Sequence, residues 1–212
     1  MLNDPIITDR TIFARNCVVR KIPRNEADKF LADNHIYGSA SCRYCYGLFV
    51  KRATGAAEKK SAPDSRHENA AIEGWTPRGQ YDSLITGEPV AVACFSNARR
   101  WEKNGRSVCS YEWVRYASLK DSRVVGGMGK LLAAFIEDHH PDDVMTYAIS
   151  TVAPGRQVRT GYGIGKSEAD NADFGNAFRK LGFVEESRMT FPSRLVEGEM
   201  SVSIKFRLKL TY

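Results

Sequence analysis

The sequence lacks any apolar run near the ~20 residues that a helix needs to cross a bilayer, so we expect no membrane partner. Its opening segment, MLNDPIITDR, contains acidic side chains and no apolar stretch typical of a secretory signal. Internal repeats are lacking as well, which argues against a solenoid or a propeller. These absences predict a cytoplasmic protein.

Cysteine is scarce and odd in number, which argues against a disulfide framework. We expect reduced and mostly buried thiols. The five cysteines are Cys17, Cys42, Cys45, Cys94 and Cys109.

One pair of cysteines, Cys42 and Cys45, has the spacing of a zinc-binding motif, with His139 and His140 as possible further ligands. No second pair accompanies it. In a strand, Cys42 and Cys45 would point to opposite faces, which is unfavourable for chelation. The sequence analysis therefore predicts no metal site.

The composition is that of one globular domain over residues 1–212, with 42% hydrophobic and 26% charged residues. It excludes a disordered chain, a collagen-like chain and a coiled-coil rod. The net charge of +6 suits an anionic partner, such as a nucleotide cofactor, a nucleic acid or a phosphorylated substrate. Ordinary solubility charge explains it equally well.

Hydrophobic periodicity predicts an α+β fold, with a mostly antiparallel central sheet, flanking helices and one βαβ crossover. The predicted strands are 17–22, 44–52, 88–96, 107–119, 144–151, 183–191 and 201–210. The predicted helices lie within 24–35, 122–141 and 173–183. Residues 53–85 have few aliphatic side chains and are predicted to form a flexible insertion, and 153–171 is a second irregular stretch. Residues 97–105 form a polar hairpin connection that turns at Asn104-Gly105.

The long strand 107–119 alternates in character, and alternation assigns its side chains to two faces of a sheet. The first face is predicted to carry Tyr111, Trp113 and Arg115, and the second Glu112, Val114 and Tyr116.

A glycine-rich turn, RVVGGMGK, follows this strand and opens a helix. Glycines let a backbone approach a ligand closely, and the N–H groups at a helix start attract phosphate. The spacing matches neither a dinucleotide-binding GxGxxG motif nor a P-loop. A tight turn that needs small residues for packing is the alternative interpretation.

The order of elements, this turn and the later segment FRKLGF together resemble the GCN5-related N-acetyltransferase (GNAT) superfamily. The resemblance implies that acetyl-CoA or another acyl-CoA is the co-substrate. Its pantetheine arm would lie between strands 107–119 and 144–151, and its pyrophosphate would bind the turn. The implied cofactor-binding residues are Ala117, Leu119, Arg123, Val124, Val125, Gly126, Gly127, Met128, Gly129 and Lys130.

A narrower likeness is to a phage-type subgroup similar to the Mom DNA-modification protein, which alters adenine bases. It rests on Asn34-His35 with Gly38, on Glu112 with Arg115-Tyr116, and on RVVGG. The subgroup implies a nucleic-acid-modifying or nucleic-acid-binding protein. The basic hairpin, which contains Trp101, is compatible with nucleic-acid contact, although a solvated hairpin end is the simpler interpretation.

The resemblance makes Glu112 the candidate general base, which would take a proton from the attacking amine. A strand carboxylate that pairs with Arg115 or Arg123, or that simply faces solvent, is the alternative. His35 is a second base candidate, and a histidine that stabilises a helix C-terminus is its alternative. A backbone N–H within 117–120 would stabilise the oxyanion.

Two positions differ from the usual pattern of the superfamily, which weakens the inference of its catalytic and binding roles for this chain. Met128 replaces the usual small residue of the turn, and Phe178 replaces a tyrosine that often protonates the leaving thiolate. Tyr147, Tyr162 or a water can take that role. The expected function is acyl transfer to an unidentified amine, either a small molecule or a macromolecule. A catalytically silent domain is a further alternative.

Overall fold

The computed structural model describes most of the chain. The described residues are 10–51, 87–120, 122–152, 159–160, 163–164, 175–193, 197–198 and 200–211. The predicted insertion over 53–85 lies outside them, as does most of 153–171. The candidate Tyr162 lies outside them too.

The chain folds into a mixed α+β structure around an eight-stranded, mostly antiparallel sheet. Its strands are β2 (Cys17–Lys21), β3 (Tyr44–Val50), β4 (Ala91–Phe95), β5 (Arg99–Lys103), β6 (Arg106–Ser118), β8 (Asp143–Val152), β11 (Val184–Pro192) and β12 (Met200–Lys209). Their order is β11-β12-β8-β6-β4-β3-β2, and β5 pairs with β6 beside this path. The β6–β8 pair is parallel. The predicted strands and the βαβ crossover are therefore confirmed.

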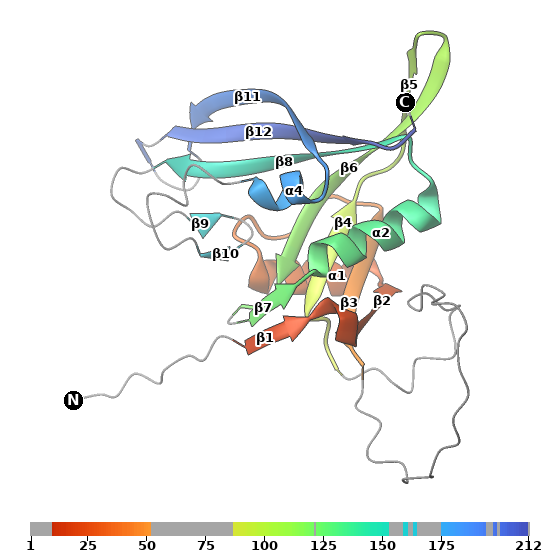
Figure 1. Ribbon diagram of the computed structural model, residues 1–212. Coiled ribbons are helices and arrows are strands. Elements are labelled where there is room, and N and C mark those ends of the chain that lie inside the picture. Colours follow the sequence, from red (N-terminus) through yellow and green to blue (C-terminus); the bar gives the residue numbers. More distant parts are fainter. Residues whose placement is uncertain are drawn as a thin grey trace, which may run out of the picture.

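Two helices cover opposite faces of the sheet (Figure 1). Helix α1 (Arg24–Asn34) buries Phe30 and Leu31 against one face. Helix α2 (Gly127–His139) joins β6 to β8 and buries Leu131 and Phe135 against the other. Both helices follow the 3.6-residue period of their apolar side chains. None of the helices that the structure describes is both long and apolar enough to span a membrane.

Shorter elements complete the described chain. A 3-10 helix η1 (Ala14–Asn16) precedes β2, and α4 (Asn176–Lys180) lies between β8 and β11 in the chain. Strand β1 (Arg10–Phe13) pairs in parallel with β7 (Ser122–Val125). Strands β9 (Arg159–Thr160) and β10 (Gly163–Ile164) form a small antiparallel pair. The sequence analysis predicted none of β1, β7, β9 and β10.

The central parallel pair is short. Strands β6 and β8 pair only from Ser110↔Asp143 to Trp113↔Thr146 and then diverge, although both continue for several residues (Figure 1). At the same point β6 contains a bulge, because Cys94 pairs with Arg115 whereas its neighbour Phe95 pairs with Trp113. A bulge bends its strand and increases its twist. We attribute the divergence to this extra residue, Val114.

The bulge also corrects the predicted faces of β6. Tyr116 lies in the same core cluster as Tyr111 and Trp113, on the α2 side. Arg115 instead pairs with Cys94, which belongs to the cluster on the α1 side. Strict alternation beyond Val114 was therefore wrong, since one inserted residue exchanges the faces of all that follow.

Candidate functional site

The start of α2 exposes backbone donors beside the divergence of β6 and β8. Gly126 is the N-cap, in a left-handed conformation with φ of 77°, and no side chain caps the helix. The Lys130 N–H donates to the Gly126 carbonyl at 3.1 Å as the first bond of the helix. The N–H groups of Gly127, Met128 and Gly129 therefore have no acceptor within the helix. We call these three N–H groups the α2 cradle; the sequence predicts that an anion binds here.

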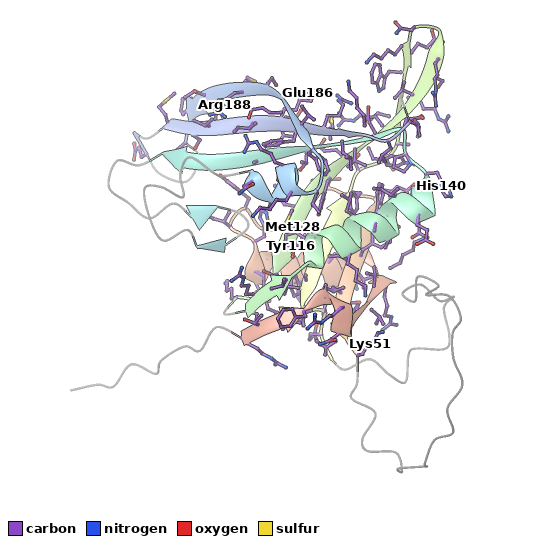
Figure 2. All side chains as sticks on the ribbon, viewed as in Figure 1. Lys51, Tyr116, Met128, His140, Glu186 and Arg188 are labelled. Carbon is purple, nitrogen blue, oxygen red and sulfur yellow. The ribbon has the colours of Figure 1, made fainter. Side chains whose placement is uncertain are left out.

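Gly127 is required by packing as well. A Cβ at this position would lie 2.8 Å from Val124 Cγ1 and 2.9 Å from Tyr116 Oη. Figure 2 shows Tyr116 and Met128 where α2 begins. The half-buried Met128 packs against the core, so its side chain fits this turn although the resemblance implies a smaller residue. Packing therefore accounts for Gly127, and phosphate binding at this turn stays a prediction.

Lys130 is held away from the cradle. Its Nζ donates to the carbonyls of Ala14 at 3.1 Å and Cys17 at 2.7 Å, at the two ends of η1. Burial lowers the pKa of Lys130, and the nearby Lys51 lowers it further. Arg123 is the other predicted cation at this turn, and its side chain is exposed to solvent.

Glu112 and Tyr147 occupy the same face of the sheet where β6 and β8 separate. Glu112 is in register with Met145, and Tyr147 follows Met145 by two residues, so their side chains point to the same side. Tyr147 is 41% exposed. Glu112 Oε2 lies 3.5 Å from the exposed guanidinium of Arg99, rather than pairing with Arg115 or Arg123 as the alternative interpretation expected.

His35 is the C-cap of α1, and its Nδ1 accepts the Tyr37 N–H at 3.1 Å. Burial lowers the pKa of His35 to about 4, with a contribution from Arg115. The imidazole is therefore neutral at neutral pH, which disfavours the interpretation of a charged histidine that stabilises the helix terminus.

Four further residues named in the sequence analysis, Ala117, Leu119, Lys120 and Phe178, have contacts within the fold. Ala117 is buried against α1. The N–H groups of Leu119 and Lys120 donate to Val90 O and Asn34 Oδ1, so these two amides are already engaged and do not serve an oxyanion. Phe178 is fully buried and contacts Trp113 and Phe206 at ring-centroid distances of 5.7 Å each.

A basic pocket that the sequence analysis missed lies near Glu112, at the ends of β3 and β4. Its volume is about 430 Å³. Its lining residues are Arg24, Ser41, Cys42, Arg43, Ser96, Asn97 and Arg99. Ser96 also connects it to Glu112, since its hydroxyl accepts the Glu112 N–H at 2.9 Å. No local sequence motif predicts this pocket, because its arginines come from three separate segments of the chain.

The cysteines beside this pocket overturn an argument made from the sequence. Cys42 lies before β3, not within it, and its Sγ is 3.4 Å from that of Cys45. Cys94 Sγ lies 3.6 Å from Cys45 Sγ. Hydrogen bonds from Cys45 and Cys94 lower the pKa of Cys42, whereas the bond with Cys42 raises that of Cys45. The cluster of possible metal ligands in the described residues includes neither His139 nor His140.

Compared with known proteins, the chain matches no protein-family model and no curated protein.

Proposed function

We propose that the protein binds an acyl-CoA and transfers its acyl group to an amine. The observation that carries the proposal is the four-residue pairing of β6 with β8, followed by their divergence next to the uncapped start of α2. Beyond Trp113 and Thr146, no described strand pairs with the facing edges of the two strands. Backbone groups on such edges need partners, and the amides of a pantetheine arm can supply them.

The α2 cradle suits the pyrophosphate of the same ligand. Three backbone N–H groups and the positive end of the helix dipole favour a diphosphate. Exposed Arg123 adds long-range attraction. Lys130 contributes to the shape of the site by fixing η1 rather than by touching the phosphate.

In the proposed reaction, the amine nitrogen attacks the thioester carbonyl carbon, and the C–S bond then breaks. Glu112 takes the amine proton, after leaving a weak ion pair with an exposed arginine. Tyr147, on the same face, is the candidate that protonates the departing thiolate. Phe178 has no proton to give and is fully buried. The basic pocket beside Glu112 favours an acceptor that carries negative charge.

Calorimetric titration with CoA tests the proposal. We expect wild-type binding in the micromolar range, and we expect Gly129→Asp to weaken it at least tenfold, because a carboxylate at the third helical position repels phosphate. The same carboxylate favours the helix dipole, so the variant should remain folded. Arg123→Glu should weaken binding, whereas Arg100→Glu, with the same charge change on exposed β5, should not.

Absence of binding at millimolar CoA would refute the proposal. Once a substrate amine is found, Glu112→Gln should lower kcat by ~100-fold while CoA affinity stays the same. Normal turnover of this variant would instead assign Glu112 a structural role.

Nucleic-acid binding is a second candidate, and the β5–β6 hairpin favours it. Trp101 is 38% exposed there, and the cations of Lys103 and Arg207 lie 5.9 and 5.8 Å from its ring centroid. The exposed ring can stack on bases and Lys103 adds positive charge, whereas Arg207 is already paired with Asp143 and Glu186. Retention on DNA that falls steeply with salt, and that Trp101→Ala weakens, would support this function.

A further inference from the structure

Three sulfur atoms from two separate parts of the sequence converge on the α1 face of the sheet. Cys45 and Cys94 are register partners on neighbouring strands, so β3 and β4 hold them opposite each other. Cys42 joins them from the bend before β3, where the Arg43 N–H donates to Phe95 O at 2.8 Å. All three sulfur atoms lie within 4.8 Å of one another.

We propose that Cys42, Cys45 and Cys94 bind one zinc ion as thiolates, and that its fourth coordination position opens into the basic pocket. Zinc–sulfur bonds of about 2.3 Å in a tetrahedron place sulfur atoms about 3.8 Å apart. The observed 3.4 and 3.6 Å separations are close to this spacing. Thiolates select soft or borderline ions, and Mg²⁺ and Ca²⁺ prefer oxygen.

Two side chains with a buried polar atom that lacks a hydrogen-bond partner interact electrostatically with the cluster. Among the described residues, the buried side-chain atoms without a hydrogen-bond partner are Asp28 Oδ1 and Arg115 Nε. Both side chains interact electrostatically with the cluster, Asp28 with Cys45 and Arg115 with Cys42. A buried orphan donor and acceptor are costly.

The open position follows from the ligand count and from the pocket. Within the described residues, the ligand cluster has three members, whereas zinc takes four ligands. Cys42 is the member that lines the pocket, beside Arg24 and Arg43. The zinc–thiolate unit carries a net negative charge, which these arginines offset. Binding releases the protons that the thiols hold, so no oxidant or reductant takes part.

Cobalt(II) provides the probe, because its spectrum reports both sulfur ligation and geometry. The full-length protein is reduced, stripped of metal and titrated with Co²⁺. We expect thiolate-to-cobalt charge-transfer absorption and tetrahedral visible bands that saturate at one equivalent and that Zn²⁺ abolishes. Added imidazole should shift the visible bands, because the fourth position is exchangeable.

Cys42→Ser should weaken zinc affinity by roughly a hundredfold or more, since one of three thiolates is lost. Cys109→Ser is the matched control, because Cys109 is also half-buried and lies outside the cluster, and it should bind as wild type does. Cys42→Ala repeats the test without a hydroxyl ligand. These substitutions affect a residue before the strand, which limits the risk of unfolding.

The proposal fails if the reduced wild type shows no charge-transfer band, or if Cys42→Ser and Cys42→Ala bind cobalt as tightly as Cys109→Ser does. Visible bands that do not respond to imidazole would overturn the open position. The site does not depend on acyl-CoA, so loss of CoA binding and loss of metal binding are separate results.

Discussion

Individual side chains around the divergence of β6 and β8 have well-defined partners. The Trp113 indole donates to Arg115 O at 3.0 Å, and the Thr146 hydroxyl donates to Trp113 O at 2.9 Å. These bonds fix the bulge from both strands. Among the described residues, the Glu112 carboxylate has a weak partner in Arg99, at 3.5 Å. A well-fixed backbone therefore presents a carboxylate that is weakly held.

His35 gives a prediction about acid stability. Its folded pKa of about 4 lies below the ordinary 6.5, so between these values the unfolded chain binds more protons than the folded chain. The free energy of unfolding should then fall, by up to about 3 kcal/mol, as pH drops from 6.5 toward 4. The full contribution is present above pH ~6.5. Urea unfolding measured across this range provides the profile.

His35→Asn should flatten this part of the profile, because its amide oxygen can still accept the Tyr37 N–H but does not titrate. His140→Asn is the matched control: this exposed residue has φ of 45°, which asparagine tolerates, and its profile should keep the wild-type slope. Parallel profiles for wild type and His35→Asn would show that His35 does not cause the acid loss.

Among the elements, helices and core strands were predictable because their patterns are local. Phe30 and Leu31 of α1, and Leu131 and Phe135 of α2, recur at helical spacing and are buried as expected. Strand β5 is polar throughout and was predicted only as a hairpin connection; its turn at Asn104-Gly105 was correct. Strand β7 forms by pairing with β1, and no sequence pattern within Ser122–Val125 predicts this pairing.

The candidate site was predictable in part for the same reason. The order of residues along the chain places the glycine-rich turn at the start of α2. Alternation along β6 places Glu112 and Trp113 on opposite faces of the sheet. The bulge at Val114 depends on how β4 pairs with β6, so Arg115 and Tyr116 were assigned to the wrong faces. The sulfur cluster was missed because Cys94 reaches Cys45 only through pairing of β3 with β4.

The contact between α2 and η1 through Lys130 allows a prediction about the free energy of unfolding. Lys130→Met keeps the apolar stem but leaves the carbonyls of Ala14 and Cys17 without this donor, which should cost about 1–3 kcal/mol of unfolding free energy. Urea unfolding measures this cost, and hydrogen exchange should accelerate at the Cys17 amide, which donates to Ala14 O. Lys29→Met, an exposed change on α1, should have little effect.

A different result for Lys130→Met would change the role assigned to Lys130. Unchanged stability together with a large loss of CoA affinity would mean that Lys130 leaves η1 and binds phosphate directly.

Among the described strands, the central sheet has two halves, β2-β3-β4-β6 and β8-β12-β11, whose backbones pair with each other only through the short β6–β8 pairing. A buried polar seam strengthens this junction. Fully buried Asp143 of β8 accepts from the Ser110 hydroxyl of β6 and from Arg207 of β12, the latter at 2.7 Å. One carboxylate thus connects three strands, two of them on opposite sides of the junction.

Removal of that carboxylate should loosen the junction between the halves. We expect Asp143→Leu to lower the free energy of unfolding by about 1–3 kcal/mol, because the mostly buried Arg207 cation loses this partner and retains Glu186. The double variant Asp143→Leu/Arg207→Met removes both charges and should regain much of the loss. A double-mutant cycle by urea unfolding measures the coupling. If Asp143→Leu alone costs less than ~1 kcal/mol, or if the double variant regains nothing, the ion pair does not hold the half-sheets together. Their junction would then depend on backbone pairing from Ser110 to Trp113 and on the apolar contacts of Trp113.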